Sequence, residues 1–157
     1  MRVSVQEADF DVGAETEALA AGRPEVGAVA SFVGYVRADK LAGESAEDQA
    51  VSAMTLEHYP GMTEKSLEAI VAEAESRWSL LGVRVIHRFG RLVPGDRIVF
   101  VGVAGSHRGE AFAACEFIMD YLKTRAPFWK KEDTPEGGRW VDAREADDAA
   151  AEKWGQA

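Results

Sequence analysis

The fold is decided by residues 97–124, RIVFVGVAGSHRGEAFAACEFIMDYLKT. The first seven residues are mostly β-branched or aromatic, which is typical of a buried strand. From residue 107 onward, apolar side chains recur at helical spacing and predict a helix that reaches residue 124. Its apolar stripe consists of Phe112, Cys115, Met119 and Leu122, joined by Ala111 and Ile118. We therefore expect a strand that leads directly into a long helix.

Outward from this stretch, strands and helices follow one another in mixed order. Residues 83–89 and 97–103 flank the turn Pro94-Gly95-Asp96, which favours an antiparallel pairing. Further strands are expected at 2–5, 26–36 and 51–59, and further helices at 15–21, 63–78 and 145–154. Hairpin signals outweigh strict strand–helix alternation, so we predict an α+β fold.

The length bounds the domain organisation. A chain of 157 residues is expected to form a single domain, 1–157. Within it, the polar and acidic stretch at residues 38–50 predicts a mobile loop. Residues 145–157 are expected to form a C-terminal helix and tail. The helix at 63–78 has Thr63 as its predicted N-cap.

Composition narrows the possible functions. The chain has 18 Lys and Arg against 27 Asp and Glu, a net charge of −9, which argues against a general nucleic-acid binder. One cysteine, Cys115, excludes a disulfide framework, and its place in the apolar stripe predicts a buried structural residue. His58 and His87 lack metal-ligand spacing, so they are interpreted as ordinary strand histidines, and we expect no metal and no cofactor.

The sequence shows neither a targeting segment nor a membrane span. Residues 1–11 carry three acidic side chains and no apolar run. The most apolar stretch, 98–104, is far shorter than the roughly 20 residues that a membrane-spanning helix needs. We therefore expect a cytoplasmic protein with no membrane partner.

Basic residues gather in one part of the chain. Residues 84–131 contain nine Lys and Arg and four Asp and Glu, a net charge of +5, whereas the remainder carries −14. A basic island in an acidic protein indicates a local anion-binding site. The alternative is that several of these arginines decorate exposed strand faces, and the charge pattern alone does not decide between the two.

A first candidate anion site is the segment Gly105-Ser106-His107-Arg108-Gly109. It lies where a strand ends and a helix begins, so free backbone N–H groups and the helix dipole favour an anion there. His107 and Arg108 would add cationic side chains. The alternative is a surface helix capped by Ser106, with a solvated arginine.

The second candidate is the segment at residues 123–131, KTRAPFWKK, with four cations around an Ala-Pro turn and a Phe-Trp pair. Lysines near other cations and partly shielded by aromatic rings have lowered pKa values and act as acids, bases or nucleophiles. The alternative is a basic helix end followed by a solvated turn. Exposing Phe128 and Trp129 is unfavourable, which indicates that the turn packs against another part of the protein.

Several segments together resemble the large, catalytic subunit of molybdopterin synthase. They are LEHYPGMT at 56–63, PGD at 94–96 leading into 98–103, SHR at 106–108 and FIMDYLKTRAPFWK at 117–130. The resemblance runs in uninterrupted order from about residue 26 to residue 154, and its longest block has an unusual composition. It implies an α/β hammerhead core with an additional antiparallel β subdomain.

The resemblance also implies an activity and partners. Members of this family are sulfurtransferases of molybdenum cofactor biosynthesis that convert cyclic pyranopterin monophosphate into molybdopterin. The two dithiolene sulfurs arrive as thiocarboxylates on the C-terminal glycine of a small ubiquitin-like subunit. The family assembles as a homodimer with one small subunit at each end, a heterotetramer. Both the substrate and the sulfur donor are anionic, which agrees with the basic island.

Residue roles follow from the resemblance as well. The expected catalytic residues are Lys123, which meets the donor tail, and Lys130, its essential companion. The expected substrate-binding residues are all basic: Arg37, His107, Arg108, Lys131 and Arg144. His107 and Arg108 form an anion-binding pair that the partner protomer can contribute across the dimer interface. Phe32 and Met119 are expected to line the pocket.

Two alternative functions stay open. A non-catalytic scaffold would bind the ubiquitin-like carrier without turnover, but it would need no paired lysines. A phosphate-binding module built on residues 106–108 would leave the segment at 117–130 unexplained. Residues 1–25 match the family pattern poorly and the loop at 38–50 is longer than that pattern, so neither segment is given a role.

Overall fold

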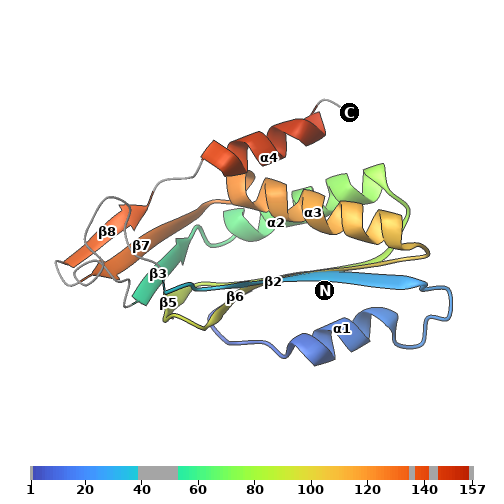
Figure 1. Ribbon diagram of the computed structural model, residues 1–157, viewed down its shortest axis with the longest axis horizontal. Helices are drawn as coiled ribbons and strands as arrows, with labels where there is room; N and C mark the ends of the chain where they lie inside the picture. Colours follow the sequence, from blue (N-terminus) through green and yellow to red (C-terminus); the bar gives the residue numbers. More distant parts are fainter. Residues whose placement is uncertain (1, 39–52, 135–136, 142–144, 156–157) are drawn as a thin grey trace.

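The computed structural model describes residues 2–38, 53–134, 137–141 and 145–155 (Figure 1). These residues form two four-stranded sheets and four helices. The α+β class predicted from the sequence is therefore confirmed. Apart from Ala38, the predicted loop at 38–50 lies outside the described residues.

The first sheet has the strand order β1-β4-β6-β2. Its strands are β1 (Val3–Gln6), β4 (Leu80–Arg88), β6 (Arg97–Gly105) and β2 (Ala28–Tyr35). β1 lies parallel to β4, whereas both β4 and β2 run antiparallel to β6. The antiparallel pairing predicted around the turn at residues 94–96 is thus confirmed.

Helices cover both faces of this sheet. α2 (Met62–Arg77), α3 (Arg108–Arg125) and α4 (Glu145–Gly155) lie on one side, and α1 (Val12–Ala20) lies on the other (Figure 1). α3 packs on β6 and β2, and α4 packs on α3. Because α3 follows β6 almost at once, it runs back over the sheet toward the beginning of that strand.

The central strand β6 is buried from its second residue onward, because both of its faces meet helices. Side chains alternate between the two faces of a strand. Val101 and Val103 join the larger core beneath α2 and α3, whereas Phe100 and Ala104 join the smaller core beneath α1. At Gly102 an added Cβ would come within 2.6 Å of Leu19 in α1, so the close approach of that helix requires glycine.

The second sheet is antiparallel and has the order β5-β3-β7-β8. Its strands are β5 (Gly90–Leu92), β3 (Ala53–His58), β7 (Phe128–Thr134) and β8 (Gly137–Val141). β5 follows β4 after one residue, and β7 follows α3 after two. The sheet corresponds to the additional antiparallel β subdomain that the resemblance implied.

Three local predictions for α3 and the segment that follows it are wrong. Phe112 was assigned to the buried stripe of α3 but is 65% exposed, because the buried face of the helix passes through Ala111, Ala114 and Ile118. The N-cap of α3 is His107 rather than Ser106. The residues after Pro127, predicted to form a turn, form strand β7, because they pair with β3.

Three arginines of the basic island hold the N-terminal segment and α1 against the first sheet. Arg97 donates hydrogen bonds of 3.0 and 2.7 Å to the two carboxylate oxygens of Asp9. Arg88 lies 3.8 Å from the same carboxylate. Arg84 donates from Nε to Glu15 in α1 at 3.2 Å. These three arginines of the basic island therefore serve the fold through ion pairs within the chain.

The Asp9–Arg97 contact makes stability depend on pH. Hydrogen bonds from Arg97 and from the backbone N–H of Phe10 hold the pKa of Asp9 at about 2, below its ordinary value of 3.8. A lowered folded-state pKa contributes stability above the unfolded pKa, and this contribution is lost as the pH falls through the folded value. The contact is therefore present at neutral pH and lost between about pH 4 and pH 2.

We expect Asp9→Asn to lower the melting temperature by roughly 1–3 °C at pH 7, since both side chains are partly exposed. The difference from the unmodified chain should shrink steeply below pH 4 and be small at pH 2, where half of the Asp9 carboxylates are protonated. Thermal unfolding followed by circular dichroism between pH 2 and pH 7 measures it, with the exposed Glu25→Gln as the matched control. A difference that stays constant over this range would contradict the assignment.

Candidate functional site

The two lysines predicted to be catalytic lie on either side of the junction between α3 and β7. Lys123 is exposed in the last turn of α3, and Lys130 is the third residue of β7. Two residues, Ala126 and Pro127, connect the end of α3 to the beginning of β7. The structure therefore brings both lysines to one end of the first sheet.

The hydroxyl of Thr63 holds this junction. The side chain is fully buried, donates a hydrogen bond of 3.0 Å to the carbonyl oxygen of Pro127 and accepts one of 2.9 Å from the backbone N–H of Tyr59. Thr63 is not the N-cap of α2, as the sequence had predicted, because Gly61 occupies that position with φ of 84°. Its hydroxyl instead ties the start of α2 to the start of β7.

Stacking of two rings holds the next residue of β7. The ring of Phe128 lies on that of His87 with centroids 3.7 Å apart and planes inclined by 19°. Burial lowers the pKa of His87 to about 3, assisted by the charges of Lys123, Lys130 and His58 and opposed by a hydrogen bond to the Arg88 carbonyl. The His87 ring is therefore uncharged at neutral pH.

Strand alternation separates Lys130 from Lys131. In the pairing of β7 with β3, Lys130 lies opposite Leu56 and Lys131 opposite Thr55. Successive residues of a strand point to opposite faces. Lys130 therefore shares a face with Phe128, whereas the predicted substrate contact Lys131 lies on the other face.

Arg37 lies at the same end of the first sheet as the lysine pair. It is exposed just beyond β2, whose last residue pairs with Arg97 at the beginning of β6. The backbone N–H of Val36 donates to the carbonyl of Asp96 at 2.9 Å, which fixes the segment as it leaves the strand.

Of the residues predicted to line the pocket, Phe32 is exposed on β2, whereas Met119 is buried in the core beneath α3.

His107 and Arg108 lie at the opposite end of α3. Both are exposed, with His107 as N-cap and Arg108 as the first helical residue. Fifteen residues separate Arg108 from Lys123, which at 1.5 Å per residue is about 22 Å along the helix. Within one chain, the predicted anion-binding pair and the lysine pair therefore do not form a single site. Arg144 lies outside the described residues.

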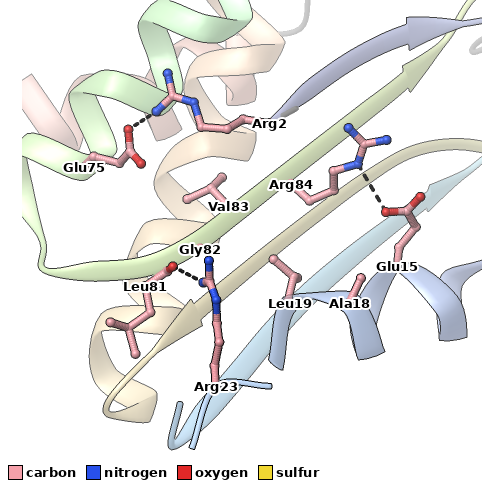
Figure 2. Close-up of a pocket in the computed structure, with 10 residues that line it drawn as sticks. All are labelled: Arg2, Glu15, Ala18, Leu19, Arg23, Glu75, Leu81, Gly82, Val83 and Arg84. Atoms are coloured by element: carbon pink, nitrogen blue, oxygen red, sulfur yellow. Dashed lines mark hydrogen bonds and ion pairs between the residues drawn. The ribbon is translucent and has the colours of Figure 1, made fainter. Parts of the chain in front are cut away.

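A hollow of about 580 Å³ lies elsewhere on the molecule, beside the first half of β4 (Figure 2). It is lined by Arg2, Glu15, Ala18, Leu19, Arg23, Glu75, Leu81, Gly82, Val83 and Arg84. Arg2 pairs with Glu75 across one wall, Arg84 pairs with Glu15 across another, and Arg23 donates to the carbonyl of Leu81. None of the predicted site residues that the structure describes lines this hollow, and the charged side chains of the hollow already have partners within the chain.

Cys115 lies in the core, as its place in the apolar stripe predicted. Burial, with a smaller effect of Glu116, raises the pKa of the Cys115 thiol to about 11, so it is a protonated core residue. Among the residues that the structure describes, no three His, Cys, Asp or Glu side chains group together in a way that could hold a metal ion. No helix in this part of the chain has the length and apolar character to span a membrane.

Comparison with known proteins places the chain in a family. The sequence profile of the MoaE protein family matches residues 5–125. The chain belongs to the MoaE family. The molybdopterin synthase catalytic subunit of Ralstonia nicotianae is 61% identical to it over 153 residues, which are 98% of this chain and 84% of that protein.

Two solved structures extend the comparison. The MoaE protein of Burkholderia ambifaria is 57% identical, covers 98% of this chain and 97% of its own, and superimposes with a TM-score of 0.81. A complex of subunits 1 and 2 of molybdopterin-converting factor from Helicobacter pylori contains a chain with a TM-score of 0.69 at 19% identity, with 91% and 90% coverage, which shows a shared fold. This MoaE-family chain thus has the activity of a molybdopterin synthase catalytic subunit, a sulfurtransferase of molybdenum cofactor biosynthesis.

In this MoaE-family chain we expect Thr63→Val to lower the free energy of unfolding by about 1–3 kcal/mol, because it leaves the Pro127 carbonyl and the Tyr59 N–H without their buried partner. Thr63→Ser keeps the hydroxyl and should lose clearly less. Urea denaturation of both variants measures the difference. Equal losses for Val and Ser would show that the hydroxyl does not hold the junction.

Proposed function

We propose that this chain takes sulfur from the C-terminal thiocarboxylate of a small ubiquitin-like subunit and transfers it to cyclic pyranopterin monophosphate. The observation that carries the proposal is the placement of Lys123 and Lys130 on the two sides of one junction, which the Thr63 hydroxyl and the stacked rings of His87 and Phe128 hold in place. The names of the relatives support the reaction, and the two-subunit complex from Helicobacter pylori supports a small-subunit partner. The cytoplasm is the proposed location.

The proposed chemistry uses the lysines as cations and proton carriers. Lys123 and Lys130 polarise the carbonyl of the thiocarboxylate as its sulfur attacks a carbon of the substrate. A new C–S bond forms there, the C–O bond at the same carbon breaks, and the departing oxygen takes a proton. Water then cleaves the acyl C–S bond, so that the carrier leaves as a carboxylate and the sulfur stays on the substrate. A second loaded carrier repeats the cycle and completes the dithiolene. Cys115 takes no part, because the sulfur comes from the carrier.

The substrate is proposed to lie between two protomers of a homodimer, with one small subunit at each end of the assembly. The distance of about 22 Å between the ends of α3 supports this arrangement, since one chain cannot bring both of its own groups to one small substrate. Arg37 of one protomer and His107 and Arg108 of its partner would then hold the phosphate and the pterin. Arg144 is proposed as a further contact, while Lys131 would have to reach the site from the opposite face of β7.

Replacing Lys123 tests the chemical role directly. We expect Lys123→Ala to lower kcat by a factor on the order of 10²–10⁴ with little change in KM, because it removes an interaction made in the transition state. The measurement mixes the purified chain with thiocarboxylated small subunit and cyclic pyranopterin monophosphate and follows dithiolene product over time. Exposed Lys65→Ala on α2 is the matched control.

The same experiment separates the alternatives. Wild-type turnover by Lys123→Ala with weakened binding would contradict the catalytic role. Carrier binding without product from the unmodified chain would point to a scaffold. Absence of carrier binding would point to a phosphate-binding module built on residues 106–108.

Mixed dimers test whether the site is shared between protomers. Lys123→Ala and the double variant His107→Ala/Arg108→Ala should each be inactive alone. In an equal mixture half of the dimers are mixed, and each would hold one intact site of two, so about a quarter of wild-type activity should return. Turnover measured after subunit exchange gives the answer. No recovery, with exchange verified by mass spectrometry, would place all of these residues in one chain's site.

A further inference from the structure

His87 is a buried polar side chain that neither the core nor the proposed chemistry uses. Among the residues whose burial the structure describes, the buried polar or charged ones are Thr63 and His87, and His87 is 4% exposed. It lies near the end of β4, opposite Val99 of β6. Burial of a polar group is unfavourable unless the group is hydrogen-bonded. An apolar side chain would fill this position at a lower cost in free energy, so the histidine is expected to have a specific role.

One hydrogen bond orients the His87 ring. Its Nδ1 lies 2.8 Å from the carbonyl oxygen of Arg88. A carbonyl oxygen only accepts, so Nδ1 carries the proton and donates it, and the neutral ring keeps its acceptor at Nε2. The ring cannot turn without losing this bond. It therefore presents a flat and fixed face to its neighbour.

That neighbour belongs to the segment that joins the two lysines. Phe128 stacks on the ring at 3.7 Å and 19°, and Lys130 follows two residues later on the same face of β7. The preceding residue, Pro127, is held by the Thr63 hydroxyl. His87 thus touches the start of the strand that carries Lys130, while Lys123 is close enough for its charge to lower the pKa of the ring.

We propose that His87 is a positioning residue for the lysine pair: its stacked ring fixes the start of β7 and with it the placement of Lys130 relative to Lys123. This inference rests on the proposed function, because it assigns His87 a part in the same reaction. Thr63 fixes the backbone at Pro127, and His87 fixes the first side chain of the strand. Together they hold the junction at two adjacent residues.

The uncharged state of His87 suits this role. Two ammonium groups already gather at the junction, and a protonated imidazole would add a third positive charge in a buried position. The titratable groups that act on the ring come from α3, β7 and β3, namely Lys123, Lys130 and His58. A neutral imidazole can stack on Phe128 without electrostatic repulsion from the two lysines. A buried imidazolium at the same place would repel both ammonium groups.

The test compares His87→Ala, which removes the stacked ring, with His87→Phe, which keeps an aromatic ring but loses the hydrogen bond to Arg88. Both variants should melt below the wild type. We expect only His87→Ala to lose kcat strongly, by on the order of 10²-fold, because small misplacements of reacting groups reduce rates by this much. His87→Phe should recover most of that rate, and KM should change little in either variant. Phe10→Ala, which removes a buried ring packed against Phe100 on the other face of the first sheet, is the matched control for lost stability.

A double-mutant cycle with Phe128→Ala provides an independent measurement. If the two rings act as one unit, His87→Ala should lower kcat no further when Phe128 is already alanine. Additive losses of kcat would overturn the inference, as would His87→Ala at wild-type kcat or an effect confined to KM. Equal kcat losses for His87→Ala and His87→Phe would overturn it too, since stability rather than stacking would then set the rate. Absence of product from the wild-type chain would instead refute the proposed function, together with everything that rests on it.

Discussion

Helices cover strand β6 on both faces, and the burial of this strand fixes the direction of α3 and the position of the basic residues at its two ends. α3 begins two residues after β6 and must bury its apolar face on the strand it has just left, so it runs back along it. The two ends of α3 therefore lie at opposite ends of the first sheet. Its sheet-facing side belongs to the core, and the two basic residues of the proposed site, Arg108 and Lys123, lie at its two ends.

At the end that carries Lys123, the chain passes from a helix on the first sheet to a strand of the second within two residues. Such a short connection transmits any shift of one sheet to the other. Two buried polar side chains, Thr63 from α2 and His87 from β4, meet the connection at Pro127 and Phe128. Lysine side chains are long and flexible, so the placement of their backbone has to come from such contacts.

Much of the arrangement of β4, β6 and α3 could be predicted from the sequence, because it depends on local sequence patterns. The apolar run of β6, the turn at 94–96 and the periodicity of α3 predicted the central unit and its antiparallel pairing. The pattern failed where the decisive partner is distant in sequence: β7 depends on pairing with β3, and its charged residues give no strand signal. Phe112 follows the helical spacing as well as Met119 does, but only the position of the sheet decides which is buried. The role of His87 depends on Phe128, 41 residues later, so no local signal marked it.

The burial of Cys115 determines how this protein reacts with oxidants and other thiol reagents. A thiol whose pKa is near 11 carries almost no thiolate at neutral pH, and it is the thiolate that reacts with disulfides, peroxides and alkylating agents. The chain therefore handles sulfur without offering a reactive thiol of its own. Thiol-specific reagents would act on the sulfur carrier and the dithiolene product and spare this subunit, whose exposed sulfur at Met62 is a thioether.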